Sequence, residues 1–188
     1  MADFDFAAAV RWARFVPRAT LARRCDADLP FLDATQVAGS ALLLDTCVYI
    51  DRLQGRAPAA VVRAIATRPV NHATVAIQEL MHTVGVLNPD DPRTVAAVSA
   101  IGRQIDAMRP HRVFAPDADV LGRAALLSGI LCRLQGYAAD GRLRALQDCV
   151  LFLLAQKLGL TVLTRNIADF DGLLQLIPAG HVLLYRTA

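Results

Sequence analysis

The sequence has few aromatic side chains, which make up 6% of its 188 residues, although 55% of the residues are hydrophobic. The apolar residues are mostly Ala, Leu and Val, a composition that favours helices and buried parallel strands over a β-sandwich. There are only four cysteines, with no C-x-x-C pair and no Cys/His spacing typical of a metal site. We therefore expect reduced and mostly buried cysteines, and no disulfide framework or zinc site.

Long apolar runs are also missing from the sequence. No uncharged run reaches the roughly 20 residues that a membrane-spanning helix needs. The acids Asp3 and Asp5 and the base Arg11 leave only a short apolar patch near the N-terminus, so no secretory signal is expected. The net charge of +3 comes almost entirely from Arg, which permits contact with phosphate without demanding it. These features predict a soluble, cytoplasmic protein.

Residues 1–40 differ in pattern from the rest of the chain. Apolar residues at helical spacing (Phe6, Val10 and Ala13) predict a short amphipathic helix, and Pro17 opens a polar connector that contains Pro and Gly. We interpret this segment as an N-terminal extension that lies on the domain or on a partner.

From residue 41 onward, apolar runs alternate with helical patterns. An unalternated apolar run bounded by polar residues is typical of a strand buried on both faces. Strands are expected at 41–45, near residue 70, and at 111–117, 160–164 and 181–185. Helices are expected at 46–55, 58–67, around Glu79, and at 91–108, 118–136, 142–159 and within 165–176. This alternation predicts an α/β fold with a mostly parallel sheet, formed by one domain over residues 41–188.

Polar side chains follow the two clearest strands of this domain. Asp45 and Thr46 follow the run "ALLL", while Thr164 and Asn166 end the run "LTVLTRN", with Asp169 three residues further on. In an open α/β sheet, ligands bind beyond the carboxyl ends of the strands. The sequence therefore places several polar groups at one end of the sheet.

Two more carboxylates, Glu79 and Asp148, interrupt apolar helical stretches. Each acid has a structural alternative: Asp45 or Asp148 could cap a helix, Glu79 could be exposed, and Asp169 could be a turn residue. Crowded carboxylates raise one another's pKa, and a divalent cation keeps them ionised. An oxygen-only donor set suits Mg²⁺ or Mn²⁺, whose chemistry includes water attack on a phosphodiester.

Four motifs carry a resemblance to a known family: "LLLDTCVYID", "HATVAIQELMH", "LQDCVLFLLAQKLGLTVLTRN" and "NIADF". In order and spacing they resemble the PIN-domain nucleases, specifically the VapC-like toxins of bacterial toxin–antitoxin pairs. The resemblance covers about residues 42–185. It implies a three-layer α/β/α domain and a metal-dependent endoribonuclease that leaves a 5′-phosphate and a 3′-hydroxyl.

The resemblance also implies roles for individual residues. The acids Asp45, Glu79 and Asp148 match the family's characteristic acidic positions, and either Asp169 or Asn166 fills the fourth. The catalytic residues expected on this basis are Asp45, Glu79, Asp148 and Asp169. Those expected to hold Mg²⁺, or Mn²⁺, are Asp45, Asp148 and Asp169. Those expected to contact the substrate are Thr46, Thr164, Arg165 and Asn166, with Arg165 as the phosphate contact.

The partners implied by the resemblance are an RNA substrate, an antitoxin protein that covers the site, and a second copy of the chain in a homodimer. A haloacid dehalogenase-type phosphatase is disfavoured because Cys47 stands where that chemistry needs a second Asp. The main alternative is a non-catalytic protein that keeps the fold and acts through a partner. The forty residues before the first strand also depart from the family pattern.

Overall fold

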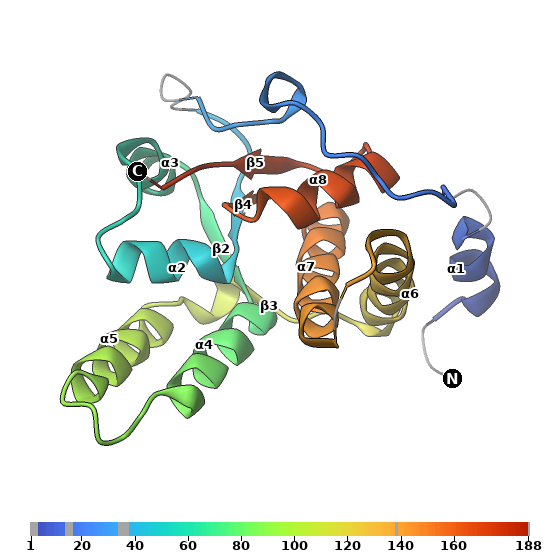
Figure 1. Cartoon of the computed structure of the whole chain (residues 1–188). Coiled ribbons are helices and arrows are strands. Elements are labelled where there is room, and N and C mark those ends of the chain that lie inside the picture. Colours follow the sequence, from blue (N-terminus) through green and yellow to red (C-terminus); the bar gives the residue numbers. More distant parts are fainter. Residues whose placement is uncertain (1–3, 14–16, 34–37, 138, 188) are drawn as a thin grey trace.

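Five short strands form the centre of the molecule. The computed structural model describes residues 4–13, 17–33, 38–137 and 139–187. The strands are β1 (Leu42–Leu44), β2 (Val70–Ala73), β3 (Val113–Phe114), β4 (Thr161–Thr164) and β5 (Val182–Leu184). They form one sheet in the order β3-β2-β1-β4-β5, with every neighbouring pair parallel (Figure 1). The predicted parallel sheet is therefore confirmed.

Helices cover both faces of this sheet. They are α1 (Phe6–Ala13), α2 (Thr46–Leu53), α3 (Ala59–Thr67), α4 (Thr74–Val86), α5 (Thr94–Asp106), α6 (Ala118–Gln135), α7 (Ala139–Leu158) and α8 (Ile167–Leu176). Two short 3₁₀ turns, η1 (Asp26–Asp28) and η2 (Pro110–Arg112), complete the elements. α2, α3 and α5 contribute to the core on one face, and α6, α7 and α8 to the core on the other. The result is the three-layer α/β/α arrangement that the motifs implied.

The central strand β1 shows why an unbroken apolar run forms here. Leu43 packs into the core beside α7, whereas Leu42 and Leu44 pack into the core beside α2 and α3. All three side chains are fully buried. Successive strand residues point to opposite faces, so a strand covered on both faces needs apolar side chains at every position.

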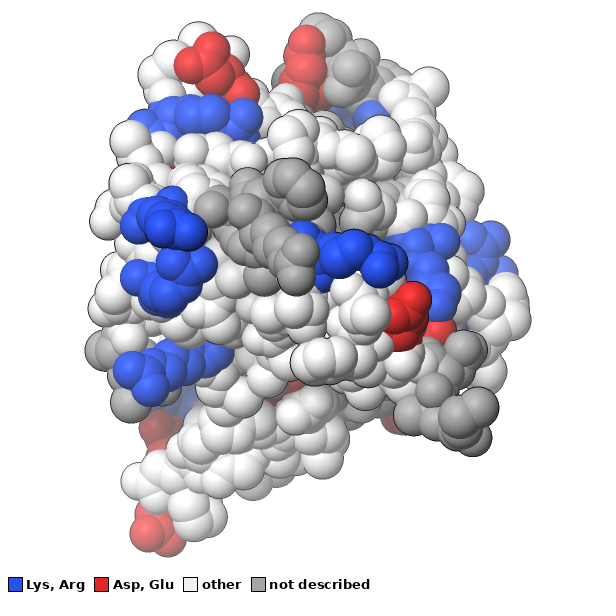
Figure 2. Space-filling model, turned by 90° about the vertical axis from the view of Figure 1, so that its right-hand side faces the viewer, with Lys and Arg blue, Asp and Glu red and all other residues white. Residues whose placement is uncertain are grey.

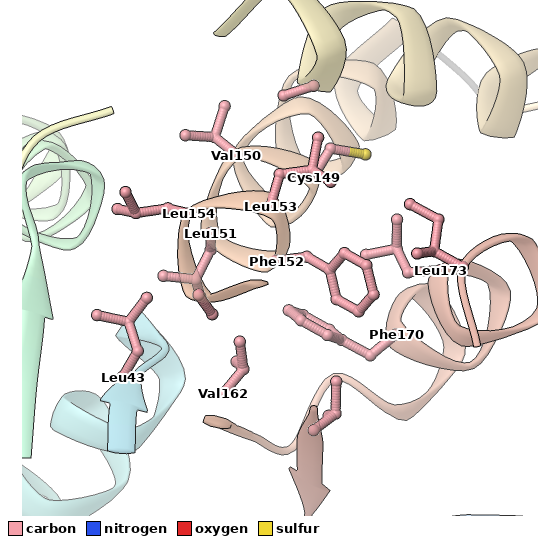
Figure 3. Packing of buried hydrophobic residues seen from close by; sticks show 14 of the residues in the cluster. Leu43, Cys149, Val150, Leu151, Phe152, Leu153, Leu154, Val162, Phe170 and Leu173 are labelled. Atoms are coloured by element: carbon pink, nitrogen blue, oxygen red, sulfur yellow. The ribbon is translucent and has the colours of Figure 1, made fainter. Parts of the chain in front are cut away.

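The larger core lies between the sheet and α7. Figure 3 shows α7 residues directed toward Leu43 and Val162 of the strands and toward Phe170 and Leu173 of α8. The rings of Phe152 and Phe170 meet edge to face, with centroids 6.3 Å apart. This packing fixes α7 and α8 against each other and against the end of β4, and these three elements carry several of the predicted site residues.

Several predicted boundaries match the structure, and one strand differs. Gly159, the expected end of α7, has a φ of 65°, the left-handed conformation that glycine adopts without strain. The strand expected over 111–117 is only two residues long, because η2 occupies residues 110–112. The N-terminal helix is present, and its expected extension into residues 14–16 lies outside the described residues.

All four cysteines are free in the structure. Only Cys149 is buried, whereas Cys25 is exposed and the other two are partly buried. The expectation that most are buried is therefore wrong. Among the described helices, none is long and apolar enough to cross a lipid bilayer.

Candidate active site

The register of the two central strands brings Asp45 and Thr164 together. β1 pairs with β4 through Leu44 and Leu163, so the next residue of each strand lies at the same carboxyl edge. Oδ2 of Asp45 accepts a hydrogen bond of 2.5 Å from Oγ1 of Thr164 and one of 3.0 Å from Sγ of Cys47. Asp45 precedes α2, yet its side chain makes no capping bond to that helix. The structure thus rejects the simple helix cap.

Glu79 reaches the same edge of the sheet from α4. Its carboxylate accepts a short hydrogen bond from Oγ1 of Thr46, the first residue of α2. Burial raises the pKa of Glu79, the Thr46 hydrogen bond lowers it, and the charge of Asp45 raises it again, for a net increase. Glu79 is therefore a partly buried acid beside Asp45, not an exposed helix residue.

Asp148 lies at the centre of the acidic group. It sits in the middle of α7, which begins at residue 139, so the interpretation of Asp148 as a cap at the helix start is wrong. Burial raises its pKa well above the usual range, and the charges of Asp45, Asp169 and Glu79 add to this increase. The other three predicted acids, which come from separate parts of the chain, therefore act electrostatically on Asp148.

Asn166 connects two of these acids. Its Nδ2 donates to Oδ2 of Asp148 at 2.9 Å and to Oδ2 of Asp169 at 2.8 Å. Its Oδ1 accepts from the backbone N–H of Asp169, so the same side chain caps the start of α8. Both candidates for the fourth acidic position are therefore present at the site. The two hydrogen bonds from this uncharged amide stabilise both carboxylates where they lie close together.

Tyr137 is a site residue that the sequence did not reveal. Its hydroxyl donates a short hydrogen bond to Oδ1 of Asp169. Burial and the charges of Asp169 and Asp148 raise the pKa of the phenol, so Tyr137 stays protonated as a donor. It follows α6 in a segment without an acidic or motif residue, and only the close packing of α6 and α7 brings it to α8.

A pocket of about 440 Å³ opens beside the acids. Its lining includes Asp45, Thr46, Glu79, Asp148 and Asn166 of the predicted set, and not Thr164, Arg165 or Asp169. The further lining residues are Cys47, Gln78, His82, Thr83, Leu143, Arg144 and Gln147. Helical spacing could have identified several of them, since residues three and four positions from Glu79 or Asp148 share the same helix face.

Arg165 contacts a different carboxylate from the four acids. Its Nε lies 2.8 Å from Oδ2 of Asp51, which is completely buried in α2. The hydroxyl of Tyr185 donates to the same oxygen at 2.8 Å, and Arg56 lies 3.2 Å from the other. In the structure the guanidinium of Arg165 forms an ion pair with buried Asp51. Its contact with a substrate phosphate therefore stays a prediction.

The donor set of the site fits a hard cation better than a soft one. The acids present carboxylate oxygens and Asn166 an amide, which are the ligands that Mg²⁺ and Mn²⁺ prefer. The raised pKa of Asp148 reports negative charge that a cation would compensate. Within the described residues, no three His, Cys, Asp or Glu side chains converge closely enough to form a ready-made ion site. The predicted ion therefore remains a proposal.

Comparisons with solved structures identify proteins of the same fold. VapBC2 from Rickettsia felis bound to promoter DNA matches with a TM-score of 0.54 and 12% identity, over 78% of this chain and 99% of that chain. FitAcB from Neisseria gonorrhoeae matches with a TM-score of 0.54 and 18% identity, over 76% and 96%. DNA-bound VapBC from Salmonella typhimurium gives 0.53 and 16%, over 77% and 97%. No sequence family and no curated protein matches the chain.

Proposed function

We propose that this protein is a metal-dependent endoribonuclease and the toxin of a toxin–antitoxin pair. The observation that carries the proposal is that Asp45, Glu79 and Asp148 line one pocket at the carboxyl end of a parallel sheet, with Asp169 joined to Asp148 through the amide of Asn166. The fold shared with VapBC and FitAcB chains supports the toxin assignment, and the motifs support the nuclease activity.

Asp45, Asp148 and Asp169 would hold Mg²⁺, or Mn²⁺ in its place. Such an ion lowers the pKa of a water molecule and neutralises charge that develops on a phosphodiester under attack. Thr164 and Cys47 fix the orientation of Asp45, and Asn166 and Tyr137 fix that of Asp169. Because its pKa is raised, Glu79 is suited to hold or transfer a proton near the pocket.

The RNA substrate would enter the pocket beside these acids. Gln78 and Gln147 offer hydrogen-bonding amides and Arg144 a positive charge along its wall. On the face that carries α1 and α6, Lys and Arg side chains lie in several separate groups, with Asp and Glu side chains among them (Figure 2). An antitoxin that covers the pocket, a homodimer and a cytoplasmic location belong to the same proposal.

Cleavage of a labelled single-stranded RNA tests the activity. We expect cleavage in Mg²⁺ or Mn²⁺, none in EDTA, and a loss of at least about 100-fold in Asp45→Asn and Asp148→Asn, because charge stabilisation in the active site is lost. Asp91→Asn is the matched control, since Asp91 pairs with Arg93 on the α4–α5 connection and does not belong to the predicted site. Equal cleavage by Asp45→Asn and the unaltered chain would reject the nuclease and favour the non-catalytic alternative.

A further inference from the structure

The described part of the N-terminal extension lies on the elements that support the acidic site. From residue 17 the chain runs across α8 to the edge of the sheet (Figure 1). Leu32 donates its backbone N–H to the carbonyl of Leu184 at 2.7 Å, and Leu184 donates to that of Pro30 at 2.9 Å. Residues 30–32 therefore continue the sheet beyond β5, with Phe31 forming a parallel bridge to Leu184.

Residues 21–24, which we call the strap, attach to α8 through Arg24. The backbone N–H of Arg24 donates to Oδ2 of Asp171 at 2.9 Å, and its Nε donates to Oδ1 at 2.6 Å. Asp171 is only 1% exposed. Nε2 of Gln175, one turn further along α8, donates to Asp171 and to the carbonyl of Ala22. A buried carboxylate held by three donors fixes the strap to this helix.

The strap also contacts the end of α6. Nε2 of Gln135 donates to the carbonyl of Leu21 at 3.3 Å. A Cβ atom added to Gly172 would lie 3.2 Å from Leu131 of α6 and 3.9 Å from Leu21. The absence of a side chain at Gly172 thus lets α8 approach α6 closely, with Leu21 packed at the same point.

Both helices held by the strap are connected to one catalytic acid. Asp169 belongs to the first turn of α8, two residues before Asp171, the anchor of Arg24. Tyr137, which donates to Asp169, follows Gln135 by two residues at the end of α6. A shift of α8 relative to α6 would therefore separate Asp169 from Tyr137 and move it relative to Asp148.

We propose that Arg24 is a positioning residue that, through Asp171, holds Asp169 in the acidic cluster. This inference rests on the proposed function, because it assigns the extension a part in building that site. The strap is then more than an added surface: it restrains the short helix α8, whose ten residues carry Asp169 near one end and the Arg24 anchor near the middle.

The test compares Arg24→Met with Arg24→Lys and with the control Arg186→Met. Arg186 ties the same extension to the segment after β5 through an exposed ion pair with Asp26 and a contact with the ring of Phe31, neither of which involves Asp171. For each variant, hydrogen exchange of residues 165–172 without metal and Mn²⁺ binding by calorimetry are measured together with the melting temperature. The first readout requires no activity and no ion.

We expect Arg24→Met to accelerate exchange across the first turn of α8 and to weaken Mn²⁺ binding roughly ten-fold, the usual cost of losing an outer-shell support. Arg24→Lys should recover part of both effects, and Arg186→Met should change neither even where it lowers the melting temperature. The proposal is overturned if Arg24→Met lowers the melting temperature while exchange and Mn²⁺ binding stay unchanged. If the unaltered chain neither binds Mn²⁺ nor cleaves RNA, the proposed function fails, and the exchange data alone decide whether Arg24 restrains α8.

Discussion

Nε of Arg165 lies 2.8 Å from Oδ2 of Asp51, although the two residues belong to the β4–α8 connection and to the middle of α2. Arg165 stands between Thr164 and Asn166, which both contact the acids of the site. Its backbone N–H donates to Sγ of Cys47 at 3.3 Å. The ion pair therefore anchors the short segment from which the site receives two of its hydrogen-bonding side chains.

Removing the guanidinium should leave Asp51 short of a partner. We expect Arg165→Met to lower the free energy of unfolding by about 2 kcal/mol, less than a fully buried pair would lose, because 42% of the Arg165 side chain is exposed. Urea unfolding measures the change. Arg93→Met, which breaks the more exposed pair with Asp91, should cost under about 0.5 kcal/mol. Similar losses of unfolding free energy in both variants would show that the buried pair with Asp51 stabilises the fold no more than the exposed pair with Asp91.

The pH dependence of stability should reveal the crowded carboxylates. The pKa of Asp148 is raised in the folded chain by burial and by Asp45, Asp169 and Glu79, so the folded state binds this proton more tightly than the unfolded state. The associated stability is present at low pH and is lost as the pH rises through the raised pKa. In metal-free buffer, Asp148→Asn should therefore raise the melting temperature at pH 8, with a gain that shrinks toward pH 4.

Melting curves in EDTA across this pH range test the prediction. Asp91→Asn is the control, because hydrogen bonds donated by Arg93 lower the pKa of Asp91, whereas the pKa of Asp148 is raised. The effect of pH on its stability should therefore run in the opposite direction. If Asp148→Asn lowers the melting temperature equally at pH 4 and pH 8, the prediction that neighbouring carboxylates destabilise ionised Asp148 is wrong. With Mn²⁺ added at pH 8, the unaltered chain should melt at a higher temperature than Asp148→Asn, because the carboxylate binds the ion more strongly than the amide does.

The hydroxyl of Thr164 should matter more than its methyl group. Thr164 is fully buried, donates to Asp45, and accepts the backbone N–H of Asn166 at 2.9 Å. We expect Thr164→Val to lower the free energy of unfolding by about 1–3 kcal/mol, because the buried carboxylate of Asp45 and the partly buried N–H of Asn166 each lose a partner. RNA cleavage should fall by roughly ten-fold or more if Asp45 loses its orientation.

Thr164→Ser separates the two contributions, since it keeps the hydroxyl and removes only the methyl group. It should retain cleavage close to that of the unaltered chain, as measured by initial rates on the same RNA. If Thr164→Ser loses as much activity as Thr164→Val, packing of the methyl group and not the hydrogen bond to Asp45 supports the site.

Prediction from the sequence succeeded where the signal was local. The runs at 42–44 and 161–164 are strands because continuous apolar residues suit positions buried on both faces. The four acids were singled out because burying a carboxylate inside or directly after an apolar segment costs free energy unless a partner compensates its charge, and their catalytic role stays a prediction. Asp148 was misplaced relative to its helix start because the polar residues of early α7 carry no clear boundary signal.

The sequence by itself thus determined the alternation of strands and helices and the four acids that interrupt them. Only the tertiary structure decided which groups hold two of those acids, Thr164 on Asp45 across 119 residues and Tyr137 on Asp169. It decided too that Arg24 of the N-terminal extension holds Asp171, an acid outside the predicted four, across 147 residues. The tertiary structure also decided that Arg165 forms an ion pair with Asp51. The physical reason is that burial and periodicity are properties of a segment, whereas a hydrogen bond between distant residues depends on how packed elements meet.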